Sequence, residues 1–201
     1  MPDPTPPGLP RGSSLPPLLP QPRLAGMGVR MLAFLMDFVL VFFFTLFLLV
    51  KVLLPQYHYE GMQEFIATID GYAASVEEAQ LNGEEPPPVP QPTADSPMVA
   101  MLAYAWEKAM LIFWIYFGLV EALFKGSTLG KRTFGLRTVK AESGQPAHFF
   151  ESVLRGAVKT LALLFPIPLP MLWWINYFVP FFNRRRRAGH DFICRTVVVA
   201  E

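Results

Sequence analysis

Residues 24–54 read LAGMGVRMLAFLMDFVLVFFFTLFLLVKVLL, and residues 31–50 of this run contain one charge, Asp37. A run of this length crosses the hydrocarbon core of a bilayer as one helix. An aspartate near the middle of such a helix costs about 2.5–3.5 kcal/mol on insertion scales, so it faces a partner, a cavity or water. Arg30 lies close to two helical turns earlier and shares that face with Ala33 and Asp37. The sequence therefore predicts an integral membrane protein with a polar seam.

The composition of the chain agrees with this class. The 201 residues are 52% hydrophobic and 14% aromatic, which suits a small bundle of membrane helices better than a globular core. The single cysteine, Cys194, excludes an internal disulfide framework and belongs to no metal motif. Residues 1–28 are rich in proline, and we expect a flexible cytoplasmic tail there. The tail lacks an apolar signal-peptide core, so residues 29–54 are expected to be an uncleaved signal anchor and the first transmembrane helix.

The segment after this helix has the opposite charge character. Residues 55–97 contain eight acidic residues and no lysine or arginine. Apolar side chains recur at helical spacing in the first half of this segment, which predicts an amphipathic helix over about residues 61–80. The second half is a proline-rich connector. Residues 98–124 are again apolar and aromatic, and they predict a second transmembrane helix.

Residues 125–151 are basic and punctuated by glycine. Within them, TFGLRTVKA (residues 133–141) predicts a short strand. The preceding GSTLGKR is similar to a phosphate-binding P-loop. However, only three residues separate Gly126 from Gly130, and Arg132 stands where Ser or Thr would bind magnesium. This departure argues against nucleotide binding by the loop.

Residues 152–182 are apolar but contain PIPLP at 166–170, and alternate prolines break a helix. Arms of about 14 and 12 residues are roughly 18–21 Å long, too short to cross a core of about 30 Å. We therefore expect a re-entrant helical hairpin, followed by a basic tail over residues 183–201. By the positive-inside tendency, both termini and the basic loop are cytoplasmic, and the acidic loop is external.

The predicted fold class is thus an all-α integral membrane protein. It has two transmembrane helices, a proline-broken re-entrant helical hairpin and a short β-like cytoplasmic loop. We expect a multi-pass protein of the bacterial inner membrane, with membrane lipids among its partners.

Three segments carry a resemblance to a known family: LAGMGVRMLAFLMD at residues 24–37, GSTLGKRTFGLRTV at residues 126–139 and RRRRAGHDFICRTVVV at residues 184–199. Together they resemble the RDD family of small membrane proteins, named for one arginine and two aspartates. The resemblance maps these onto Arg30, Asp37 and Asp191. The proline-rich N-terminal tail and the acidic loop fall outside the family pattern. At the positions of Cys194 and Arg195 the family pattern often has small residues. The resemblance implies a family of unknown function, with transport suggested for some members.

Arg30 and Asp37 each have two interpretations. Arg30 can reach lipid phosphates at the cytoplasmic edge or pair with Asp191, as the family resemblance favours, and both can hold together. Asp37 either makes a helix-to-helix bond that sets the bundle geometry, or serves as a proton or cation site. Arg155 and Lys159, four residues apart, can neutralise that aspartate or act as interfacial anchors.

A second polar stripe is predicted on the second transmembrane helix. Glu107, Trp114, Gly118 and Glu121 fall within about 40° of one another around the helix axis and can face the aspartate of the first helix. The alternative is an interfacial position, with Glu121 paired to Lys125. Arg155 and Lys159 of the expected hairpin can also neutralise Glu121.

The remaining candidates are simpler. The run of four arginines is expected to contact anionic lipid headgroups, at about 1 kcal/mol per residue near the surface. These are Arg184, Arg185, Arg186 and Arg187. Nucleic acid is not an expected partner, because the run directly follows a membrane segment. His190 has no second ligand at metal spacing, and no nucleophile has a base and an orienting group. We therefore expect no metal, no cofactor and no enzyme activity.

These features leave three functions open. The first is ion or small-solute transport by a homo-oligomer that uses an intramembrane aspartate, because two crossings per subunit cannot enclose a pathway. The second is an accessory or assembly subunit of a larger membrane complex, which suits the small size and the aromatic helices. The third, a lipid-binding or stress-response protein, has no specific support.

Overall fold

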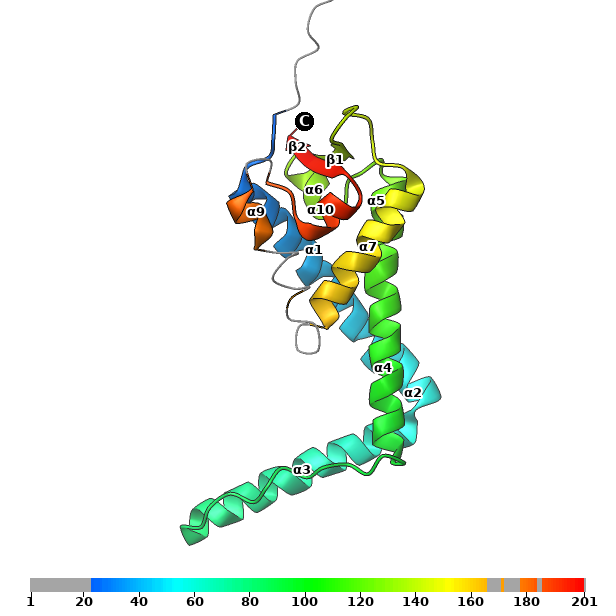
Figure 1. Ribbon diagram of the computed structural model, residues 1–201. Coiled ribbons are helices and arrows are strands. Elements are labelled where there is room, and N and C mark those ends of the chain that lie inside the picture. Colours follow the sequence, from blue (N-terminus) through cyan, green and yellow to red (C-terminus); the bar gives the residue numbers. More distant parts are fainter. Residues whose placement is uncertain (1–22, 166–170, 172–177, 184–185, 201) are drawn as a thin grey trace, which may run out of the picture.

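A computed structural model describes residues 23–165, 171, 178–183 and 186–200. Three predictions lie outside the described residues: those for the proline-rich tail before residue 23, for the PIPLP tip of the hairpin, and for Arg184 and Arg185. Figure 1 shows a small mixed head at one end, two long helices that descend from it, and one helix lying crosswise at the far end.

Two described helices are long and apolar enough to cross a membrane. The first, Met27–Tyr57, consists of α1 (Met27–Leu48), the π-helix η1 (Leu49–Leu53) and α2 (Leu54–Tyr57). The second, Pro97–Leu123, consists of α4 (Pro97–Trp114), the π-helix η2 (Ile115–Val120) and α5 (Glu121–Leu123). They pack through a cluster of Val41, Phe113, Tyr116 and Phe117. The two predicted spans are therefore present as helices.

One boundary was predicted wrongly. The first transmembrane helix was expected to end at residue 54, but it continues through Pro55 to Tyr57. Proline lacks an N–H, and the π turn that precedes it shifts the hydrogen-bond pattern just before that position. The proline then occupies the first turn of α2. Backbone N–H groups in a first turn have no partner within the helix, so α2 loses no hydrogen bond there.

The acidic segment forms the predicted amphipathic helix, α3 (Tyr59–Asn82), which lies crosswise to α4 (Figure 1). It ends at Gly83, whose positive φ of 71° is the left-handed conformation that caps a helix. At its other end, Gly61 allows close packing on α4, because a Cβ there would lie 2.4 Å from the carbonyl oxygen of Pro97. Glu64 accepts a 2.8 Å hydrogen bond from the backbone N–H of Met98. These contacts fix the base of α3 to the start of α4.

The head contains a two-stranded antiparallel sheet of β1 (Leu136–Lys140) and β2 (Thr196–Ala200). The pairing runs from Leu136 opposite Ala200 to Lys140 opposite Thr196. Two short helices complete the head: α6 (Leu129–Thr133) and α10 (Gly189–Ile193). The predicted fold class is incomplete here: β1 lies within the predicted strand, whereas β2 falls in a tail for which no strand was predicted. The basic loop and the tail are thus one folded unit.

The first arm of the predicted hairpin is α7 (Phe149–Leu164), which begins three residues earlier than expected. Glu151 accepts a 2.8 Å hydrogen bond from the backbone N–H of His148 and so caps this helix. The helix crosses η2 at two glycines, since a Cβ on Gly156 would lie 2.4 Å from the Cα of Gly118. Of residues 171–182, which were expected to form the second arm, the structure describes Met171 and residues 178–182, with the short helix α9 (Val179–Phe182).

Candidate functional site

Asp37 lies on α1 in a site that we call the Asp37 site, formed with Tyr116, Thr128 and Gly130. Its side chain is buried and accepts three hydrogen bonds. The Tyr116 hydroxyl donates at 2.5 Å, the Gly130 backbone N–H donates at 2.7 Å, and the Thr128 hydroxyl donates to the other carboxylate oxygen. All three donors are uncharged. The carboxylate therefore fixes the start of α6 to the first long helix.

Gly130 is required for this contact. A Cβ at this position would lie 2.2 Å from the carbonyl oxygen of Ala33 and 2.8 Å from Cγ of Asp37. Ala33 was predicted to allow the close approach of another helix. The element that approaches it is the short helix α6, which follows the second long helix.

Glu121 lies at the start of α5 and is fully buried. Lys131 and Lys159 each place an ammonium nitrogen 3.0 Å from its Oε2. Arg155 binds its other oxygen, Oε1, through Nη1. Thr138 on β1 supports this arrangement by accepting hydrogen bonds from Arg155 and, at 2.8 Å, from Lys131. One carboxylate thus holds three cations that come from α6 and α7.

Asp191 is the second buried carboxylate of the head, in α10. Arg155 reaches its Oδ1 at 2.7 Å, and Arg30 reaches its Oδ2 at 2.9 Å. The backbone N–H of Ala188 donates to it at 3.0 Å, and the Thr196 hydroxyl donates at 3.3 Å. Arg155 therefore links the two carboxylates through one guanidinium group. We call these linked groups the ionic network: Arg30, Glu121, Lys131, Arg155, Lys159 and Asp191.

The charges of the ionic network do not balance among the described residues. Four cationic side chains surround two carboxylates. Burial alone would raise the pKa of Asp191, but Arg155, His190 and Arg30 together hold it well below its ordinary value. Burial lowers the pKa of Lys131 well below its ordinary value, and Glu121 offsets only part of this effect. The described network therefore contains more basic than acidic side chains, arranged around ionised carboxylates.

A family model described as the RDD family matches residues 24–195, which include the Asp37 site and the ionic network. The chain belongs to the RDD family. No curated protein and no solved structure matches it. The resemblance inferred from three short segments is thus confirmed over most of the chain.

In this RDD-family protein, the three residues onto which the resemblance maps the arginine and two aspartates of the family name fall into two groups. Arg30 and Asp191 bind each other in the ionic network. Asp37 lies in the separate site with uncharged donors. Of the two interpretations of Arg30, the structure shows the pair with Asp191. Neither Arg155 nor Lys159 pairs with Asp37, since both bind Glu121.

The predicted stripe on the second long helix divides. Glu107 lies far from the head, with 69% of its side chain exposed, and pairs with Lys108 at 2.7 Å. Glu121 joins the ionic network instead of facing Asp37 or pairing with Lys125. Trp114 donates its indole N–H to the carbonyl oxygen of Val153 at 3.2 Å and so binds α7. The expectation that the whole stripe faces Asp37 was wrong: Trp114 and Gly118 pack against α7, and Tyr116 on the same long helix binds Asp37 instead.

The described members of the arginine run bind backbone oxygens. Arg186 donates to the carbonyl oxygen of Ala25 at 3.4 Å, and Arg187 donates to that of Thr196 at 3.1 Å. In addition, Arg30 donates to the carbonyl oxygen of Arg186. These two arginines therefore help to hold the tail on the head, a role that the sequence analysis did not predict.

Sequence reasoning named Arg155 and Lys159 as possible partners of Glu121, and the structure shows both pairs. It missed the partners of Asp37, and it missed Lys131 and Thr138 beside Glu121. Thr128 and Gly130 lie in the GSTLGKR motif, which was considered only as a nucleotide loop. Lys131, in the same motif, was treated as a topology signal. Tyr116 and Thr138 had no signal of their own, because a hydroxyl that serves a buried carboxylate looks like any other in sequence.

His190 and Cys194 lie beside the network. His190 is buried with its Nε2 3.5 Å from Asp191, and burial lowers its pKa well below the ordinary value. Burial also raises the pKa of the Cys194 thiol. Among the residues that the structure describes, no group of three His, Cys, Asp or Glu side chains is placed to hold a metal ion.

Proposed function

We propose that this RDD-family protein is a multi-pass protein of the bacterial inner membrane that transports ions or small solutes as a homo-oligomer. The two long apolar helices support the membrane placement. The basic loop and tail, folded together in the head, support a cytoplasmic location for that end, and the acidic α3 segment then lies outside. Because two crossings do not enclose a pathway, several copies form it.

The observation that carries this proposal is the surroundings of Glu121. It lies at the end of the second span, fully buried, with Arg155, Lys131 and Lys159 around it. Charged groups at membrane depth are expensive and usually mark an ion or substrate pathway. A core built only for stability would be equally well served by apolar residues of similar volume. The network is therefore the candidate transport centre.

The geometry also suggests how the network changes state. Arg155 contacts Glu121 and Asp191 at once, so a change of charge at either carboxylate alters the attraction on the shared guanidinium. That change is transmitted to α7, which carries Arg155, and to α1, which carries Arg30. In this proposal Asp37 keeps α6 on α1 and is a positioning residue, while Glu121 and Asp191 bind or release the transported charge.

The test is transport by the full-length protein in liposomes. Wild type, Lys159→Gln and Glu107→Gln are reconstituted, and proton, sodium, potassium and chloride fluxes are followed under imposed gradients. In Lys159→Gln, Glu121 keeps two cationic partners, so the fold is expected to persist. We expect a flux in the wild type that falls about tenfold in Lys159→Gln and stays within about twofold in Glu107→Gln, a tenfold change corresponding to 1.4 kcal/mol.

Two results would contradict this proposal. One is the absence of any flux from wild-type protein that is monodisperse before reconstitution. The other is equal flux in Lys159→Gln and wild type for an ion that the wild type carries. Circular dichroism and size exclusion of each variant show that a lost flux is not lost structure.

The second candidate is an accessory subunit of a larger membrane complex, and α3 favours it. This helix extends away from the bundle (Figure 1), and Phe65, Ile66 and Ile69 on it are exposed. Its acidic residues repel anionic lipid, so a protein surface suits this face better than the membrane. Native mass spectrometry of the complex extracted from its membrane separates the two functions: copies of this chain alone favour transport, and a fixed ratio with unrelated subunits favours an accessory role.

A further inference from the structure

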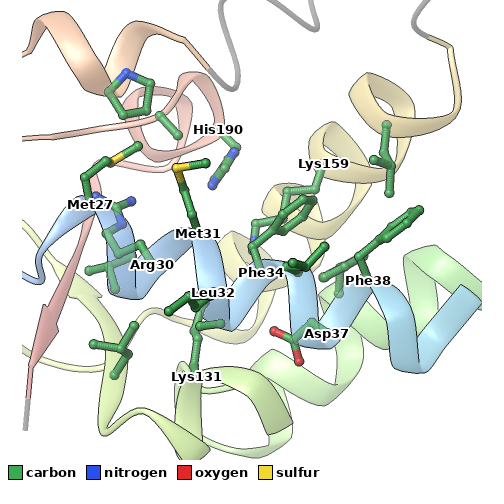
Figure 2. A pocket seen from close by; sticks show the side chains of 18 of the residues that line it. Met27, Arg30, Met31, Leu32, Phe34, Asp37, Phe38, Lys131, Lys159 and His190 are labelled. Carbon is green, nitrogen blue, oxygen red and sulfur yellow. The ribbon is translucent and has the colours of Figure 1, made fainter.

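A cavity of about 710 Å³ lies beside the ionic network. Its walls come from the first three turns of α1, from α7 and α9, and from the head near α10. Cavities of this size with mainly apolar walls and a few polar groups are typical of small-molecule sites. Figure 2 shows Met31, Phe34 and Phe38 of α1 on the side of the helix that also faces Lys159 and His190. The cavity thus has an apolar wall and a basic end.

Among the described residues that line the cavity, four are arginine or lysine: Arg30, Lys131, Arg155 and Lys159. Asp37 is the one carboxylate among these described lining residues, since neither Glu121 nor Asp191 lines the cavity. Arg155 is 1% exposed, and its Nε–H has no acceptor in the described structure. A buried donor without a partner is costly, and it is satisfied when an acceptor binds. Because Arg30 and Arg155 both bind Asp191, their guanidinium groups lie close together and can receive one anionic group.

The opposite part of the cavity is apolar and open to the surroundings. Met31, Leu35 and Phe181 line it and are 54%, 55% and 55% exposed. Exposed side chains of this kind in the candidate span face lipid rather than water. The mouth therefore admits an acyl chain, while the basic end accepts a charged head.

We propose that this cavity binds an anionic phospholipid, with its phosphate against Arg30 and Arg155 and one acyl chain along Phe34 and Phe38. This inference rests on the membrane placement proposed above and not on transport. The head of such a lipid lies at the cytoplasmic interface, where the first turns of α1 begin, and its chain enters through the apolar mouth. The site differs from the arginine run, whose described members bind backbone oxygens.

The occupant is a phospholipid rather than a soluble anion because the cavity joins a basic end to an apolar wall and mouth. A free phosphate would contact the basic end only and none of the apolar residues of the wall. A zwitterionic lipid would fill the same wall but would bring a positive charge toward an electropositive end. Only an anionic amphiphile satisfies both ends of the cavity.

The test measures lipid binding by full-length, delipidated protein in a neutral detergent, using native mass spectrometry. The probes are dioleoyl phosphatidylglycerol, dioleoyl phosphatidylcholine, oleate and inorganic phosphate. We expect phosphatidylglycerol to bind at least about tenfold more tightly than phosphatidylcholine, which has the same chains. Inorganic phosphate is expected not to compete at millimolar concentration.

Two pairs of variants locate the site. Met31→Trp fills the mouth and is expected to weaken phosphatidylglycerol binding about tenfold, whereas Met36→Trp, on the same helix but outside the cavity wall, changes it less than about twofold. Phe181→Ala removes one side of the mouth, and its neighbour Phe182→Ala is the matched control. Both test positions are more than half exposed, so folding is not expected to depend on them.

The outcomes are decisive in both directions. Charge-selective binding that both mouth variants weaken, and neither control weakens, supports the site. Equal binding of the two phospholipids, tighter binding of oleate than of phosphatidylglycerol, or equal loss in variants and controls would overturn it. Liposome flux is not used here, so a failure of this test leaves the transport proposal standing, and a failure of transport leaves lipid binding measurable.

Discussion

Asp37 and Glu121 are both buried carboxylates of the long helices, but their surroundings are opposite in kind. Asp37 is bound by a tyrosine hydroxyl, a threonine hydroxyl and a backbone N–H. Glu121 is bound by Arg155, Lys131 and Lys159. Around Asp37, neutral donors stabilise a single negative charge. Around Glu121, three basic side chains gather at one carboxylate. The difference separates a site that fastens two elements from a site that can respond to an ion.

The comparison also indicates which site tolerates change. Removing one neutral donor from the Asp37 site leaves two others in place. Removing the carboxylate of Glu121 leaves three buried cations with no common partner, and buried unpaired charge is far more costly than a lost neutral hydrogen bond.

Glu121→Gln is expected to cost about 3–5 kcal/mol of unfolding free energy, because it strips the ionic network of one of its two carboxylates. Equilibrium unfolding in mixed micelles measures this change. Glu107→Gln, on the same long helix but largely exposed, is the control and should leave the midpoint nearly unchanged. If the two substitutions had similar effects, the network would not be the charged centre described here.

Gly130→Ala tests the fastening role of the Asp37 site. The added methyl group collides with backbone at Ala33 and with Asp37 itself, so a loss of about 1–3 kcal/mol is expected. Gly28→Ala is the control: a Cβ there meets nothing within 4 Å, and alanine in a helix is favoured over glycine by up to about 1 kcal/mol. A stable Gly130→Ala protein would show that α6 is not held on α1 in this way.

His190 gives the network side a pH dependence. Its pKa in the folded protein lies well below the ordinary value, so the unfolded chain takes up this proton first as pH falls below about 6.5. Stability should therefore decrease by up to about 1.4 kcal/mol per pH unit below that point. In His190→Gln this decrease in unfolding free energy should be absent between about pH 6.5 and pH 5.5. A His58→Gln control that flattened the curve equally would refute the assignment.

Tyr116→Phe should have the smallest effect. It removes one of three donors to Asp37 and leaves the ring packing in place. The free energy of unfolding should therefore fall by about 0.5–1.5 kcal/mol, measured by equilibrium unfolding. Tyr104→Phe, on the same helix, provides the comparison, because it packs its ring against His58 and Tyr57. A loss above that of Glu121→Gln would reverse the ranking.

Much of the fold could be predicted from the sequence. The two long helices and α3 follow from apolar runs and helical spacing, which depend on local residues. The pairing of β1 with β2 joins segments nearly sixty residues apart, and no local pattern specifies which strand finds which partner. The end of the first helix was also misplaced, since a π turn that accommodates Pro55 has no distinct sequence signal.

The candidate site was predictable only in part. Arg30, Asp37, Asp191 and Glu121 stood out because charges in or beside apolar runs are rare. Arg155 and Lys159 were also named as possible partners of Glu121. Thr128 and Lys131 were not, because they lie in a loop where polar residues are common. The prediction that Glu107 belongs to a stripe facing Asp37 was wrong. Residues can share one side of a helix and still lie too far apart along its axis to reach the same partner.

We expect the buried ions of the network to act as one electrostatic unit, separate from the Asp37 site. A double-mutant cycle tests it: Arg30→Gln with Lys159→Gln spans the network, and Tyr116→Phe with Lys159→Gln spans the two sites. We predict a coupling free energy above about 1 kcal/mol in the first cycle and additivity within about 0.5 kcal/mol in the second. Additivity in the first cycle, or strong coupling in the second, would contradict the separation of the two sites.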